Sequence, residues 1–174
     1  MAFSSIDQSV INGIFIPRSG FGQKVKDNFD NHESRIAGLE SAIAHARYVR
    51  TAALSTAWSG DKQMSFPTMR KSHPAITPVG TDNLAFLLEP GLWRLCAGAR
   101  AAATCQVSIA TGQTWSVNNV IAAGSGASLN DNVALDIDFD VQTAVCVNVY
   151  NGASGNISTG FGDATFISMT RQAA

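Results

Sequence analysis

Charged residues are scarce in this chain of 174 residues. The 12 Lys and Arg and the 13 Asp and Glu make up 14% of it, where about 25% is usual in globular proteins. The formal net charge is -1. A protein that binds nucleic acid carries a cluster of basic residues that neutralises phosphates, and this sequence has none. The composition therefore argues against nucleic acid as a partner.

Long apolar runs are missing as well. No stretch approaches the roughly 18 uninterrupted apolar residues of a membrane-spanning helix. The first residues also lack the basic and then apolar pattern of a secretory signal. Hydrophobic residues still form 45% of the chain, which is enough for a core and argues against disorder. We expect a soluble, unsecreted protein without a membrane partner.

Cysteine and histidine are too few and too scattered to predict a metal centre. Cys96, Cys105 and Cys146 contain no CxxC pair, and the three His lie far from them in sequence. Each Cys lies within an alternation of apolar residues, which is typical of small buried side chains. We therefore expect no disulfide framework, no metal and no cofactor.

No combination of side chains in the sequence suggests catalysis. The Gly-rich run at 124–128 lacks the spacing and the context of a nucleophile elbow. Two of the His, His32 and His45, fall in a predicted helix, and His73 lies in a Pro-rich loop. No nucleophile, base and acid are expected to meet, so we predict that the protein is not an enzyme and has no catalytic residues.

Three carboxylates form the most conspicuous polar row. Asp136, Asp138 and Asp140 alternate with apolar residues, so in a strand they lie on one face, spaced by about 7 Å. A calcium loop needs a Gly at its sixth position and a closing Glu, and neither follows here. We interpret the row as a solvated strand face. Divalent-cation binding where three copies meet around an axis remains the alternative.

The stretch from Val25 to Ala46 has apolar residues at alternating steps of four and three, as in a coiled coil. The predicted seam consists of Val25, Phe29, His32, Ile36, Leu39, Ile43 and Ala46. Arg35 and Glu40 fall at g and the following e, the positions that pair neighbouring parallel chains. We predict a helix over 25–47 that assembles, with a trimer allowed by the seam. An amphipathic helix lying on its own domain is the alternative.

One seam position is polar. His32 falls at a d position among apolar residues. We interpret it as a residue that sets the register of the coil, and anion binding or pH sensing on a three-fold axis as the alternative.

Residues 1–16 carry several apolar side chains without a partner of their own, and we predict that 1–24 is an anchoring segment. This segment is too short to fold alone, so its apolar side chains must dock on something else. The predicted anchor residues are Phe3, Ile6, Ile11, Ile14 and Phe15.

After the helix the pattern changes to a period of two, which is typical of half-buried strands. Candidate strands are 48–52, 63–66, 84–88, 93–97, 105–109, 135–141, 145–150 and 165–170, separated by Gly, Asn and Pro turns such as 59–61. Several short strands at close spacing predict an antiparallel β-sandwich or jelly roll over 48–174.

Two tryptophans receive different interpretations. Trp93 lies within a regular alternation and is expected in the core. Trp115 lies beside a Gly turn among polar neighbours and is the candidate for a ligand-contacting aromatic, together with Asn118 and Asn119.

Two stretches resemble known families. The span 15–40, with KDN at 26–28 and RIAGLE at 35–40, looks like the N-terminal segment of small structural proteins of tailed phages. The remainder is similar to the jelly roll of the tumour-necrosis-factor (TNF) and complement globular heads. The matching stretches are EPGLWR at 89–94, VCVNVYN at 145–151 and ATFIS at 164–168.

The resemblance implies a homotrimer on the surface of a virion, assembled in the host cytoplasm and anchored by residues 1–24. Its partner there would be the major capsid protein or a tail protein. We expect a capsid decoration or head-fibre protein. The alternative is a tail adhesion module that contacts a host surface glycan.

Overall fold

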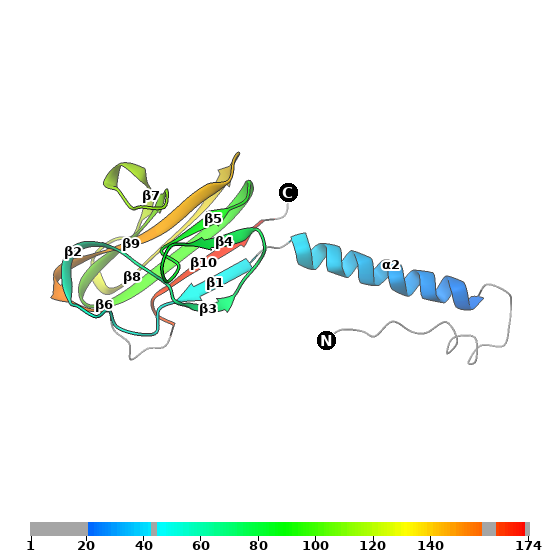
Figure 1. Cartoon of the computed structure of the whole chain (residues 1–174), viewed down its shortest axis with the longest axis horizontal. Helices are drawn as coiled ribbons and strands as arrows, with labels where there is room; N and C mark the ends of the chain where they lie inside the picture. Colours follow the sequence, from blue (N-terminus) through cyan, green and yellow to red (C-terminus); the bar gives the residue numbers. More distant parts are fainter. Residues whose placement is uncertain (1–20, 43–44, 158–162, 173–174) are drawn as a thin grey trace. The chain divides into compact units, whose positions relative to one another are not determined.

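The computed structural model describes residues 21–42, 45–157 and 163–172, which fall into two units, 1–42 and 43–174 (Figure 1). The first unit contributes one described element, helix α2 (Phe21–Ala42). Lys26 and Asp30 form an ion pair of 2.5 Å across one turn of this helix. The predicted anchor residues all precede residue 21 and lie outside the described part.

The predicted helix is confirmed in type but not in extent. It ends at Ala42, whereas the heptad pattern extended it to Ala46 and the predicted domain boundary to residue 47. Strand β1 (His45–Val49) follows, and Ala46 is fully buried in the β unit rather than part of a helical seam. An apolar residue at 46 fits both the 3.5-residue repeat of a coiled coil and the alternation with Tyr48 in a strand. In the structure Ala46 belongs to the strand.

The seam residues that precede Ala42 all belong to α2, while Ile43 lies outside the described residues. Val25 is half-buried, and Phe29 and His32 are exposed in the single chain. The exposed fraction of Phe29 is 49%, which is high for a large apolar side chain. Phe29 and His32 therefore leave part of the predicted seam exposed in the described residues.

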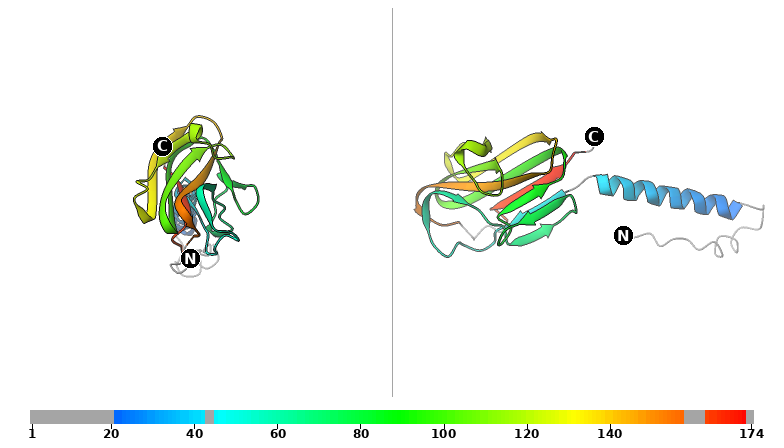
Figure 2. Two further views of the ribbon diagram at one scale, coloured as in Figure 1. Left: turned by 90° about the vertical axis from the view of Figure 1, so that its left-hand side faces the viewer. Right: turned by 45° about the horizontal axis from the view of Figure 1, so that its top comes forward.

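The second unit consists of antiparallel strands in one curled sheet (Figure 2). Besides β1 its strands are β2 (Trp58–Gln63), β3 (Thr68–Lys71), β4 (Ile76–Val79), β5 (Ala85–Leu88), β6 (Gly91–Thr111), β7 (Val120–Ala123), β8 (Ser128–Phe139), β9 (Thr143–Gly155) and β10 (Phe166–Arg171). The order is β3-β1-β10-β6-β9-β5-β4, with β2 on β9, and β7 and β8 on β6.

Strand β6 joins the two halves of this sheet. Its residues up to Arg100 pair with β10 and β8. Its residues from Cys105 pair with β9 and β7, and the register with β8 shifts between these two positions. The sequence alternations at 93–97 and 105–109 are therefore two parts of one long strand.

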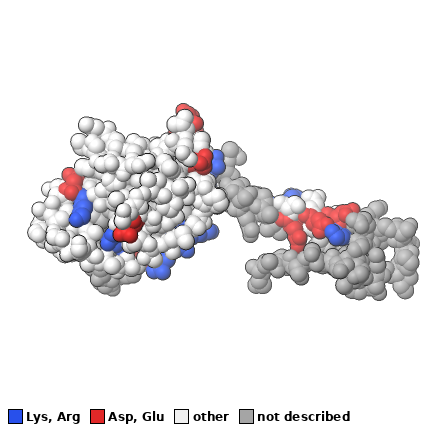
Figure 3. Space-filling model, in the orientation of Figure 1, with Lys and Arg blue, Asp and Glu red and all other residues white. Residues whose placement is uncertain are grey.

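The core lies between the two halves of the curled sheet. Its largest fully buried side chains are Trp93, Tyr48, Phe66, Phe86, Met64, Leu88, Leu95, Ile109, Ile167 and Met169. Trp93 is a core residue as predicted, and its indole Nε1 donates a hydrogen bond of 2.8 Å to the carbonyl oxygen of Glu89. Charged groups are sparse on the face of the β unit seen in Figure 3, in line with the composition.

Two of the three cysteines are buried, as predicted for small core residues, and Cys96 is half-buried. Burial raises the pKa of Cys146 to about 11 and also raises the pKa of Cys105.

Because the thiolate is the reactive form, we expect an alkylating reagent at mildly alkaline pH to leave Cys105 and Cys146 unmodified until the protein is unfolded. Mass spectrometry of native and denatured samples checks this, and rapid native modification of either residue would contradict it.

The predicted turn at 59–61 is wrong. These residues belong to β2, which pairs with β9 through an irregularity between Trp58 and Gly60. Gly60 has a φ of +80°, a conformation that a side chain would oppose. A bulge in a strand and a tight turn use the same residue types, which is why the sequence favoured the turn.

Candidate functional site

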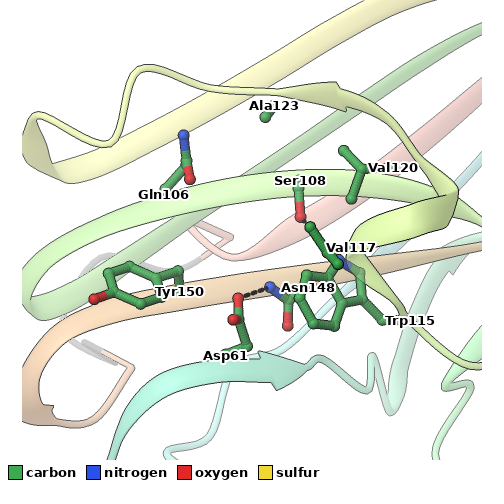
Figure 4. Close-up of a pocket in the computed structure, with 9 residues that line it drawn as sticks. All are labelled: Asp61, Gln106, Ser108, Trp115, Val117, Val120, Ala123, Asn148 and Tyr150. Atoms are coloured by element: carbon green, nitrogen blue, oxygen red, sulfur yellow. Dashed lines mark hydrogen bonds between the residues drawn. The ribbon is translucent and has the colours of Figure 1, made fainter.

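A hollow of about 430 Å³ lies on the face of β2, β6 and β9 that points away from the core (Figure 4). Its lining residues are Asp61, Gln106, Ser108, Trp115, Val117, Val120, Ala123, Asn148 and Tyr150. Val107 and Val149 alternate with these polar residues and are fully buried on the core side. The same period of two that builds the core therefore lines the hollow on the opposite face.

Strand pairing brings the polar residues of the hollow together. Gln106 of β6 lies opposite Tyr150 of β9, and Ser108 lies opposite Asn148. Asp61 of β2 lies opposite Tyr150 on the other side of β9. The polar lining residues thus form two adjacent rows across three strands.

The segment 112–123 forms the wall of the hollow opposite β2 (Figure 4). It contains the 3-10 helix η1 (Val117–Asn119), whose N-cap is Ser116. The side-chain oxygen of Asn119 accepts a hydrogen bond of 2.8 Å from the Ser116 amide. The Asn119 amide nitrogen donates to the carbonyl oxygens of Thr111 and Thr114. These bonds stabilise the wall from within.

Trp115 is fixed between this wall and the sheet. Its backbone amide donates to Gln63 Oε1 at 2.9 Å, and its indole Nε1 donates to Ser108 Oγ at 3.2 Å. It is half-buried against a small cluster that contains Ala110 and Cys146. Trp115 therefore lines the hollow but is less exposed than the sequence suggested.

The two asparagines predicted beside Trp115 do not line the hollow. Asn118 is exposed, and its backbone amide donates to the Ser116 hydroxyl. The side chain of Asn119 is committed to hydrogen bonds within its own loop. Asn119 therefore has a structural role in its loop, as polar side chains in tight loops commonly satisfy the backbone. Its contact with a ligand stays a prediction.

Asp61 and Asn148 form the polar centre of the hollow, and sequence reasoning missed both. Asn148 Nδ2 donates to Asp61 Oδ1 at 2.7 Å. Asn148 is 1% exposed, and its Oδ1 has no hydrogen-bond partner among the described residues. An unpaired buried acceptor is costly, so such groups are uncommon in native proteins. An Asn between the valines at 147 and 149 was the available signal.

The far end of the wall is held by a buried carboxylate, Asp131 of β8, which is 6% exposed. Its Oδ2 accepts a hydrogen bond of 2.8 Å from the Val107 amide, and its Oδ1 accepts one of 3.2 Å from the Ser125 amide. A Cβ added at Gly124 would lie 2.1 Å from Asp131 Oδ2. Only glycine at 124 allows the chain to approach the carboxylate this closely.

The row Asp136, Asp138 and Asp140 is exposed on one side of β8 and the turn that follows. Asp136 lies 3.7 Å from Arg94 and accepts a hydrogen bond of 2.8 Å from Gln172. The interpretation as a solvated face fits this exposure. In the described part of the chain, no group of three or more His, Cys, Asp or Glu is placed to hold a metal ion.

The three histidines lie on separate elements. His45 Nδ1 is hydrogen-bonded to the Thr170 hydroxyl at 2.8 Å, and His73 Nδ1 accepts from the Ala75 amide at 3.1 Å. Burial, together with the positive charges of Lys71 and Arg47, lowers the pKa of His45. His32 is exposed on α2. None of the three lines the hollow.

No helix within the described residues is long and apolar enough to cross a membrane. No protein-family model matches the sequence, and no curated protein matches it. Comparison of the fold with solved structures does find similar proteins.

Murine APRIL at pH 8.0 is similar with a TM-score of 0.53 at 9% identity, over 75% of this chain and 99% of that chain. The globular domain of zebrafish complement 1qA gives 0.51 at 10% identity, over 73% and 94%. Eiger TNF from S. frugiperda gives 0.51 at 12%, over 75% and 92%. These likenesses show the fold, and the predicted antiparallel TNF-like jelly roll is confirmed.

Proposed function

We propose that this chain is a homotrimeric structural protein of a bacteriophage virion, a capsid decoration or head-fibre protein displayed on the particle surface. The observation that carries the proposal is the order of the parts. A helix with a heptad seam, Phe21–Ala42, directly precedes a TNF-like jelly roll. The resemblance of residues 15–40 to phage structural proteins supports the setting on a virion.

In this proposal the parts have separate tasks. Three helices associate through the seam residues, of which Phe29 is exposed in the single chain. The segment 1–24 binds the major capsid protein or a tail protein of the same particle through its apolar residues. Trimerisation presents three such segments at once, so weak contacts at each give strong attachment together. The jelly roll then faces the solvent.

Electron microscopy of intact virions tests the location. A tagged copy of the protein, expressed during infection by the phage that encodes it, is labelled and viewed in negative stain. We expect label distributed over the head. Label confined to the tail would favour the adhesion role described below, and absence of label from purified particles would overturn the virion proposal.

Deletion of residues 1–24 separates attachment from folding. We expect the truncated protein to keep the circular dichroism and melting temperature of the β unit, because residues 43–174 form a unit of their own with its own core. We also expect it to lose binding to particles that lack the native protein. Quantitative electrophoresis of sedimented particles measures the occupancy. Wild-type occupancy by the truncated chain would show that the anchor assignment is wrong.

The hollow favours a second candidate, a tail adhesion module that contacts a host cell-wall glycan. Trp115 and the exposed Tyr150 lie at its two ends with polar groups between them (Figure 4). Aromatic faces beside hydrogen-bonding groups suit sugar rings, which have apolar faces and polar edges. Binding of the labelled trimer to host cells, with removal by added cell-wall fragments, would support this role over decoration.

A further inference from the structure

We propose that the hollow on the outer face of β2, β6 and β9 binds a neutral sugar ring, with Asp61 and Asn148 receiving its hydroxyl groups and Tyr150 contacting its apolar face. This inference rests on the adhesion candidate and gives it a specific site. The hollow is large enough for a small ligand. Its volume of about 430 Å³ lies within the range of known ligand sites, roughly 300–1,000 Å³.

The polar groups of the hollow offer mainly hydrogen-bond acceptors. The amide nitrogen of Asn148 is already used by Asp61, which leaves Asn148 Oδ1 without a partner among the described residues. Gln106 Nε2 donates to the carbonyl oxygen of Gly124, so the donor group of this amide is also in use. A complementary ligand must therefore bring several donors, as the hydroxyl groups of a sugar do.

Asp61 makes the hollow negatively charged. It is the only charged residue among the lining residues, and no ion pair involves it within the described residues. The neighbouring Lys62 has its ammonium group 6.0 Å from the ring of Trp58, a residue outside the lining set. An uncompensated carboxylate repels phosphates and sugar acids, so the ligand is neutral rather than anionic.

The hydrogen bond between Asp61 and Asn148 sets the geometry of recognition. At 2.7 Å it holds the two side chains next to each other across β2 and β9. Adjacent acceptors held in fixed positions suit two neighbouring hydroxyl groups on one ring better than a single point charge such as an ammonium group. This pairing favours a sugar over a simple amine.

Aromatic and apolar groups complete the site. Tyr150 is 45% exposed at one end of the hollow, and Trp115 is half-buried at the other (Figure 4). Val117, Val120 and Ala123 add apolar surface along the wall. Burial of the C–H face of a sugar ring against these groups contributes affinity, while the acceptors fix its orientation.

The test is a titration of the full-length protein with methyl glycosides of glucose, galactose and N-acetylglucosamine. Trp58 and Trp93 are buried, so a change in tryptophan fluorescence on binding reports on Trp115. Saturation-transfer NMR identifies the bound ligand protons. We expect millimolar binding of at least one glycoside, and no comparable binding of glucuronate. No binding, or equal binding of glucuronate, would overturn the proposal. So would binding of a simple alkylammonium ion in preference to every glycoside.

Two variants with matched controls locate the site. Asp61→Asn keeps the shape of the side chain and removes its charge, and we expect it to weaken sugar binding about tenfold. The control Asp138→Asn changes an exposed carboxylate on β8 and should leave binding unchanged. Tyr150→Ala removes an exposed ring with little expected effect on folding, and Leu129→Ala, at a similar exposure of 49%, is its control.

These outcomes separate the pocket from the biological role. If the glycosides bind and Asp61→Asn weakens that binding, while the trimer does not bind host cells, the site stands and the adhesion role fails. If wild-type and Asp61→Asn trimers bind cells equally well, with melting temperatures unchanged, the site is not the recognition surface and the inference is wrong.

Discussion

We expect that replacement of both Ile36 and Ile43 by Asp converts the proposed trimer into a monomer. Both positions are a positions of the heptad repeat, and Ile36 lies within α2. In the assembled coil each Asp side chain would be buried against two copies of itself. Burial of unpaired like charges costs several kcal/mol per trimer. We expect this cost to exceed the free energy of association that a seam of about three heptads contributes.

Sedimentation velocity at micromolar concentration measures this change. The control is Ser34→Asp together with Ser41→Asp, which adds the same charge seven residues apart on the opposite, polar face of the same helix. We expect that variant to remain trimeric. Circular dichroism should show the same β content in all three proteins, because the β unit has its own core. A wild-type protein that sediments as a monomer would end the trimer proposal.

The sequence predicted the strands best where one face of the sheet is buried. At 93–97 the residues Trp93, Leu95 and Ala97 are fully buried, and Arg94 between them is exposed. This alternation follows directly from the pleat of a strand. The end of the helix was harder to place, because Ala46 satisfies both a heptad and an alternating pattern. Whether Ala46 joins the helix or the strand depends on its pairing with β10, which is distant in sequence.

The candidate site was less accessible to sequence reasoning. Asp61, Gln106 and Asn148 are far apart in the chain and become neighbours only through the register of β2 and β6 on β9. No local pattern encodes that register. Trp115 was named from the sequence because it is an aromatic residue beside a Gly turn, and it lines the hollow. The sequence does not reveal that the side-chain amide of Asn119 bonds to its own loop.

Asp131→Ala is expected to lower the free energy of unfolding of the β unit by about 3 kcal/mol. The substitution removes the acceptor of two backbone amides, those of Val107 and Ser125. Val107 is fully buried, so its amide would lose its partner without access to water. The loop at 124–126 would also lose its attachment to β8, although the Gly124 amide still donates to the Val107 carbonyl oxygen at 2.8 Å.

Urea unfolding at a fixed protein concentration measures this effect, because subunit association also contributes to the apparent stability. Asp131→Asn retains one acceptor oxygen in the same position, and we expect it to lose less stability than the Ala variant. Asp138→Ala, on the exposed side of the same strand, should change the free energy by no more than about 0.5 kcal/mol. If Asp131→Ala were as stable as Asp138→Ala, the carboxylate would not be what holds the wall of the hollow to the sheet.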